Sequence, residues 1–138
     1  MVTIKLHGRE IPLLYTMYEM KTIQEEIAPV NTAVRMIMGQ NPENEEDNSK
    51  SGSPEHIATV AKVVRILGNA GLEENGQEPN LTEKWIMRGI KPIRMVETAN
   101  ACLEAMAEGM KSEIPEKETD EPVDVTLEEM KKKERREN

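Results

Sequence analysis

The sequence predicts a mainly α-helical domain that opens with a β-hairpin and ends in an acidic tail. Apolar residues alternate with polar ones over the first fifteen residues, and from residue 17 onward they recur every three or four positions. Alternation is typical of a strand with one buried face, and the longer spacing is typical of an amphipathic helix. We expect four to five helices packed on the hairpin over residues 1–111, and a disordered charged tail over residues 112–138.

Composition limits both the core and the partners. The chain has 138 residues, which is enough for one domain, but only 37% are apolar and none is Phe; about 45–50% is usual. We therefore expect a small aliphatic core. The net charge of −8 argues against nucleic-acid binding, because phosphate contacts need clustered Lys and Arg.

Cysteine use and hydropathy indicate the compartment. Cys102 is the single cysteine, so an intramolecular disulfide is excluded, as suits a reducing compartment. The first residues lack the basic and apolar regions of a signal peptide, and no run of about 18 apolar residues predicts a membrane helix. We expect a cytoplasmic protein without membrane contact.

Residues 2–15 predict a β-hairpin that turns at His7-Gly8. Glycine adopts the positive φ that a two-residue hairpin turn requires, and His tolerates it better than most residues. Pro12 removes one backbone donor and predicts that the second strand has an edge side. The edge strand of the hairpin could pair with a second copy. The predicted apolar face consists of Val2, Ile4, Leu6, Ile11, Leu13 and Tyr15.

A helical pattern follows the hairpin directly. Thr16 and Glu19 have the spacing of a capping box, which predicts a helix start at residue 17. Pro29 interrupts the pattern, so we expect helices over about 17–28 and 29–38, or one helix kinked there. The apolar stripe consists of Met20, Ile23, Ile27, Val30, Val34 and Ile37.

Residues 39–53 contain no apolar side chain and four acids against one Lys, which predicts a mobile acidic loop. Ser53 and Pro54 then supply an N-cap and a first-turn proline for a helix over 54–68 that ends at Gly68. Its apolar set consists of Ile57, Val60, Ala61, Val64 and Leu67.

Residues 68–80 predict a second polar loop. Thr82 caps a short helix around Trp85, and Pro92 opens a last helix that runs over about 93–110. The stripe of that helix consists of Val96, Ala99, Leu103, Met106 and Met110.

The tail beyond residue 111 is polarised in charge. Residues 113–129 carry eight acids against Lys117, whereas residues 131–136 carry five bases and one acid. Such tails are usually solvated, and otherwise they dock weakly and reversibly on a charged partner. A capping box at Thr126 favours a short, marginal helix over 127–136.

The sequence offers no constellation for catalysis, a metal or a cofactor. His7 is expected to serve the hairpin turn, and His56, in the first turn of a helix, is expected on the surface. No Ser, Cys or Asp pattern completes a triad with either histidine, and two His with one Cys do not make a zinc site. Cys102 is expected to be a small buried residue. We therefore expect a protein that is not an enzyme.

Ten methionines are unusual for a chain of this length. Flexible thioether side chains either fill an irregular core that lacks Phe or form adaptable surfaces that grip apolar segments. The sequence does not decide between these uses. The candidate partner-binding residues are Met20, Ile23, Ile27, Met36, Met38, Val96, Leu103, Met106 and Met110.

The opening stretch VTIKLHGREIPLLYTMYEMKTIQEEI resembles the start of the tail-assembly chaperones of long-tailed phages and prophages. The shared pattern is an alternating strand, Gly-Lys/Arg-Glu, hydrophobic-Pro-hydrophobic, and then a helix with a Glu-Glu pair. The matching positions are Ile4, Leu6, Gly8, Arg9, Glu10, Ile11, Pro12, Leu13, Met20, Ile23, Glu25, Glu26 and Ile27.

The resemblance implies a role without catalysis. Such chaperones bind the long, hydrophobic tape-measure protein, keep it soluble, help the tail-tube protein polymerise around it and then leave, so the chain would not be part of the mature virion. Many are made in two lengths by a ribosomal frameshift, for which Lys131-Lys132-Lys133 could encode the slippery site. The alternative is a small acidic phage or bacterial adaptor or regulator that acts by protein–protein binding.

Overall fold

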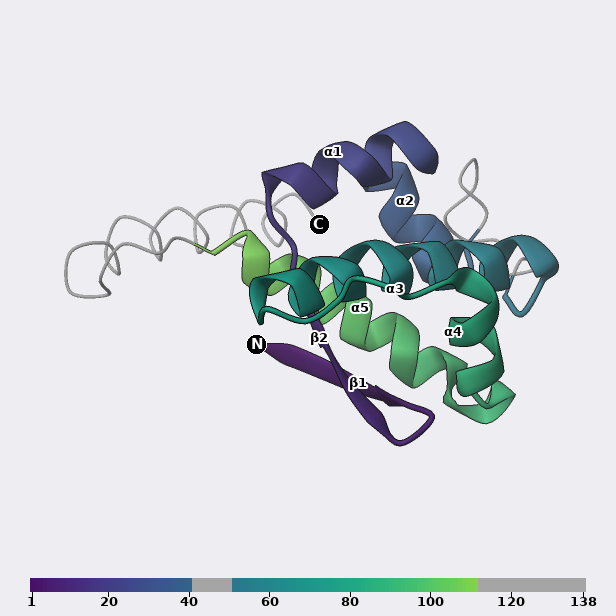
Figure 1. Cartoon of the computed structure of the whole chain (residues 1–138). Coiled ribbons are helices and arrows are strands. Elements are labelled where there is room, and N and C mark those ends of the chain that lie inside the picture. The colour runs from purple at the N-terminus through teal and green to yellow at the C-terminus, as the bar shows by residue number, and fades with distance from the viewer. Residues whose placement is uncertain (41–50, 112–138) are drawn as a thin grey trace.

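The computed structural model describes residues 1–40 and 51–111. The predicted loop 39–53 is therefore described only at its two ends, and the predicted tail 112–138, with its helix over 127–136, lies outside the described residues. Within the described ranges the fold is mainly helical, with five α-helices, one short 3₁₀ helix and an N-terminal hairpin (Figure 1). The predicted fold class is confirmed for this part of the chain.

The hairpin forms as predicted. Strands β1 (Val2–Leu6) and β2 (Arg9–Leu13) are antiparallel, with Leu6 opposite Arg9 and Val2 opposite Leu13. His7 and Gly8 form the turn with φ values of 52° and 77°, the left-handed pair of a two-residue hairpin loop.

Two short helices follow the hairpin. Helix α1 (Met17–Glu26) begins at Thr16, whose backbone N–H donates to the Glu19 carboxylate at 2.9 Å, and helix α2 (Val30–Ile37) begins directly after Pro29. The two-helix alternative of the prediction is therefore correct.

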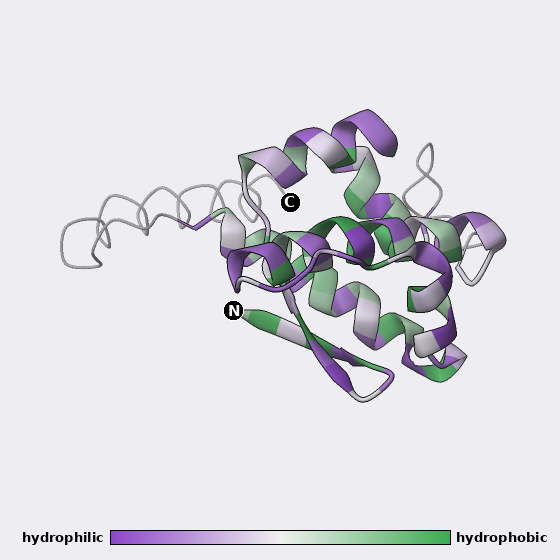
Figure 2. Cartoon of the chain, in the orientation of Figure 1, coloured by the Kyte–Doolittle hydropathy of each residue, from purple (hydrophilic) through white to green (hydrophobic). Residues whose placement is uncertain are grey.

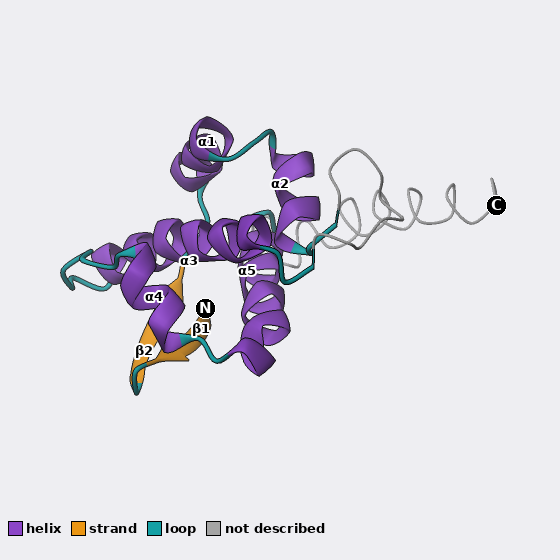
Figure 3. Ribbon diagram, turned by 90° about the vertical axis from the view of Figure 1, so that its right-hand side faces the viewer, coloured by secondary structure: helices purple, strands orange, loops and turns teal. Residues whose placement is uncertain are grey.

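Helix α3 (Pro54–Glu74) is the centre of the fold. Ser53 Oγ accepts the His56 backbone N–H at 3.1 Å, as expected for the N-cap. In Figures 1 and 3, α3 lies between the α1–α2 pair on one side and the hairpin on the other. In Figure 2 the hydrophobic residues concentrate along α3 and α5.

The prediction that α3 ends at Gly68 is wrong. The helix continues six residues further, so the first part of the predicted loop 68–80 is helical. Gly68 and Gly71 serve close packing instead: a Cβ at Gly71 would lie 2.0 Å from the carbonyl oxygen of Pro12 in β2. The Leu14 backbone N–H also donates to the Leu67 carbonyl at 3.0 Å, so the hairpin contacts α3 backbone to backbone.

The two remaining α-helices also pack against α3. Thr82 Oγ1 accepts the Trp85 N–H at 3.3 Å and caps helix α4 (Glu83–Gly89), as predicted. The 3₁₀ helix η1 (Pro92–Arg94) then leads into α5 (Met95–Gly109), so the last predicted helix starts as a 3₁₀ turn.

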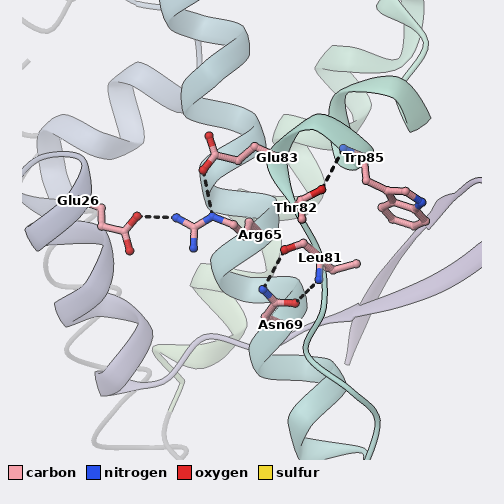
Figure 4. A network of polar contacts seen from close by, with 7 residues as sticks. All are labelled: Glu26, Arg65, Asn69, Leu81, Thr82, Glu83 and Trp85. Atoms are coloured by element: carbon pink, nitrogen blue, oxygen red, sulfur yellow. Dashed lines mark hydrogen bonds and ion pairs between the residues drawn. The ribbon is translucent and has the colours of Figure 1, made fainter.

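Polar contacts of α3 hold the flanking elements in place (Figure 4). The Arg65 guanidinium pairs with Glu26 at the end of α1 and, through Nε at 3.1 Å, with Glu83 at the start of α4. The Asn69 side chain accepts the Leu81 N–H at 2.9 Å and donates to the Leu81 carbonyl at 3.4 Å. Through Arg65 and Asn69, one face of α3 thereby holds α1, α4 and the segment that precedes α4.

Candidate functional site

An apolar groove lies where α1, α2 and α5 meet. Its volume is about 330 Å³, near the lower end of the range for ligand pockets. We call it the α1–α5 groove. Its lining residues are Tyr15, Met20, Val30, Asn31, Val34, Leu103, Met106, Ala107 and Met110.

Local sequence features shape this groove. The cap at Thr16 sets the start of α1, and the break at Pro29 lets α2 leave the direction of α1 (Figure 3). Gly109 lets α5 approach the segment between β2 and α1 closely, because a Cβ there would lie 2.2 Å from the Tyr15 carbonyl oxygen. Thr16, Pro29 and Gly109 thereby set the positions of α1, α2 and α5 around the groove.

Four of the nine predicted partner-binding residues come together in the groove. Met20 comes from α1, and Leu103, Met106 and Met110 come from α5. Met110 is 70% exposed at the helix end, whereas Met106 is buried at the groove floor. Among the methionines that line the groove, Met110 is therefore the most accessible to a partner.

The other five predicted residues lie outside the groove. Ile23 is fully buried in the core and cannot face a partner, because α1 packs this residue inward toward the rest of the fold. Ile27 and Met36 are half-buried, and Met38 is exposed just beyond α2. Val96 lies 66% exposed at the opposite end of α5.

Sequence reasoning missed five residues of the lining: Tyr15, Val30, Asn31, Val34 and Ala107. Val30 and Val34 belonged to the predicted stripe of residues 20–37, so the period of that stripe was the available signal. Nothing in the sequence pattern distinguished Asn31 or Ala107.

Tyr15 forms a buried wall of the groove. Its ring packs against Gly109, and its hydroxyl has no hydrogen-bond partner among the described residues. Burial raises the pKa of the Tyr15 hydroxyl above its ordinary value of 10, because the phenolate loses hydration. The wall is thus neutral over the physiological range.

The histidines serve the fold. The expectation that His56 lies on the surface is wrong: it is 6% exposed. Its Nδ1 accepts the Gly52 N–H at 2.9 Å, which leaves the ring proton on Nε2 for the Ile37 carbonyl at 2.8 Å. His56 therefore joins the end of α2 to the start of α3. The His7 ring packs against the Trp85 ring in a tilted arrangement, with ring centroids 4.4 Å apart.

Cys102 is fully buried, as predicted. Burial raises the pKa of its thiol to about 12, because the thiolate would lose hydration. The thiol is therefore neutral and packs as a small apolar group of α5.

Residues 1–40 and 51–111 contain neither a metal-binding cluster nor a membrane-spanning helix. In these ranges no group of three or more His, Cys, Asp or Glu side chains is placed to hold a metal ion. Nor does any described helix have the length and apolar character needed to cross a membrane. No protein-family model, curated protein or solved structure matches the chain.

Proposed function

We propose that this protein is a tail-assembly chaperone of a long-tailed phage or prophage, and that it binds the tape-measure protein through the α1–α5 groove. The resemblance of residues 2–27 to such chaperones supports the family. The groove, with Met20 from α1 and three residues from α5, is the observation that carries the binding mode.

Helix-in-groove capture is the contact that these residues favour. An amphipathic client helix lays apolar side chains into an apolar groove at spacings of three and four. Methionine side chains adapt to varied client surfaces because they are unbranched and polarisable. A client with many different apolar segments would therefore find one tolerant site.

The proposed mechanism is mass action and needs no catalytic group. Binding of an apolar segment lowers the concentration of free, aggregation-prone client. The net charge of −8 keeps the complex soluble by mutual repulsion. Release then follows when the tail-tube protein competes for the same client surface.

Co-expression with the tape-measure protein tests the proposal. The gene to use is the very long one that follows the tail-tube gene in the same cluster. We expect the wild-type chain to move the long protein into the soluble fraction, and Met20→Gln/Met110→Gln to lose this effect. Met17→Gln is the matched control, because Met17 is 80% exposed on α1 and lies outside the groove lining.

The outcomes separate the chaperone from the alternative. Unchanged solubility with the wild-type chain would contradict the chaperone proposal. A gene cluster without tail-tube and tape-measure genes would favour a small acidic adaptor or regulator that uses the same groove.

A further inference from the structure

A second surface differs in charge from the rest of this acidic protein. Residues 84–96, which follow Glu83 in α4 and continue through η1 to the start of α5, contain four basic residues and no acid. All four basic residues are exposed. They are Lys84, Arg88, Lys91 and Arg94.

Apolar side chains lie within this basic surface. A groove of about 270 Å³ is lined by Gly52, Ile57, Val60, Ala61, Met87, Ile90, Pro92 and Met95. Ile57, from the apolar set of α3, is 38% exposed there. Ile93 is 88% exposed and Val96 is 66% exposed. We call residues 84–96 together with this groove the basic–apolar patch.

The four basic side chains lie beside the groove, and most of them have no ion pair with another described residue that a ligand would need to displace. Lys84, Met87 and Arg88 follow the spacing i, i+3, i+4, which places them on one face of α4. Among the described residues, no carboxylate lies within ion-pair distance of Lys84, Arg88 or Lys91. Arg94 pairs with Glu97 at 3.2 Å, but exposed pairs of this kind are weak and exchangeable.

We propose that the basic–apolar patch binds the acidic segment 113–129 of the same chain. That segment carries eight acids against one Lys, and its apolar residues include Val123, Val125 and Leu127. Its composition is complementary to the patch in both charge and apolar content. The inference uses a surface separate from the α1–α5 groove and does not depend on the proposed function.

The chain is long enough for this contact. Helix α5 has 15 residues, so its last turn lies about 22 Å from the patch at its first turn. Eight extended residues span about 26 Å, so a return from residue 112 brings residues 120–129 to the patch.

Tethering favours this occupant over other polyanions. A segment joined by a short linker has an effective concentration in the mM range. Nucleic acid and anionic membranes must instead approach a protein of net charge −8 against long-range repulsion. The segment of a second copy would compete only at a protein concentration as high as the effective concentration of the tethered segment.

Paramagnetic broadening in the full-length chain tests the proposal. A nitroxide on Thr126→Cys labels the segment alone, because Cys102 is fully buried. At low salt we expect the segment to occupy the patch in at least about half of the chains, because its effective concentration is in the mM range. The label should therefore broaden the amide signals of residues 84–96. High salt should remove the broadening, because it screens exposed charges.

A charge reversal supplies the matched comparison. Lys84→Glu/Lys91→Glu should abolish the broadening at the patch, whereas Lys5→Glu/Lys21→Glu has the same net charge and should retain it. Lys5 and Lys21 are exposed on β1 and α1.

Three results would overturn the proposal. The first is an unbroadened patch at low salt, and the second is broadening that survives the reversal of Lys84 and Lys91. The third is equally strong broadening in isotopically labelled protein without a nitroxide when it is mixed with an unlabelled copy that carries one, which would assign the patch to a second copy.

Discussion

Replacement of Gly71 by Ala tests the packing of the hairpin on α3. The added Cβ would lie 2.0 Å from the Pro12 carbonyl oxygen, whereas ordinary contacts begin at 3.4 Å, so β2 or α3 must shift by about 1.4 Å, the difference between these distances. Overpacking costs about 1–3 kcal/mol or more. A shift of this size also weakens the hydrogen bond from Leu14 to Leu67, which is worth about 1 kcal/mol.

Helix propensity acts in the opposite direction. Ala in place of a helical Gly contributes about 1 kcal/mol, so the net free energy of unfolding should fall by about 1–3 kcal/mol. For a domain of this size that lowers Tm by about 4 °C or more. Far-UV circular dichroism during heating and in guanidinium measures both quantities.

Gly68→Ala is the matched control in the same helix. Its nearest contacts are the side-chain ends of Leu81 at 2.6 Å and Ile11 at 3.0 Å, which can move. We expect a change within about 1 kcal/mol, because the propensity gain offsets mild crowding. A Gly71→Ala variant as stable as wild type would contradict the close contact between β2 and α3.

Two further predictions concern polar groups. Arg65→Gln should lower the free energy of unfolding by about 1–2 kcal/mol, because it removes two partly buried ion pairs with Glu26 and Glu83; urea unfolding checks this, and a loss equal to that of Arg65→Lys would contradict a role for the planar guanidinium. Cys102 makes stability fall as pH rises from about 9 toward 12, because the thiol ionises in the unfolded chain while burial keeps it protonated in the fold, with its pKa raised to about 12. The contribution approaches about 1.4 kcal/mol per pH unit, and Cys102→Ala should unfold with a correspondingly shallower dependence on alkaline pH; an identical slope would refute it.

Local signals were sufficient for the hairpin and for the starts of α1, α3 and α4. A few neighbouring residues determine the positive φ angles of the His7-Gly8 turn and the helix caps at Thr16, Ser53 and Thr82. A short stretch of sequence is therefore enough to predict them. The break at Pro29 is of the same kind.

The sequence did not predict the end of α3 beyond Gly68 or the exposure of Ile57, because the surroundings of both residues come from distant parts of the chain. Glycine is common at helix ends, but Gly68 lies inside α3, where the side-chain ends of Leu81 and Ile11 pack closely against it. Ile57 belongs to the correct stripe, yet α4 and η1 leave it in an open groove. Periodicity indicates the face of a helix and not the depth of its partner.

The candidate site was predictable only in part for the same reason. Met20 and Ile23 belong to one stripe, but Ile23 points into the core and Met20 into the α1–α5 groove. Likewise Met110 and Val96 belong to the stripe of α5 and lie at opposite ends of the helix. The crossing of α1, α2 and α5 decides which residues meet, and this crossing depends on contacts with α3 that the stripes do not encode.

The affinity of the chain for apolar helical segments of the tape-measure protein tests the central claim most directly. Isothermal titration should be performed with wild type, Met20→Gln/Met110→Gln and the control Met17→Gln. Loss of apolar burial at two methionines should weaken binding about tenfold or more, with the control unchanged. Equal affinities for wild type and the groove variant, or no binding by wild type, would contradict the α1–α5 groove as the client site.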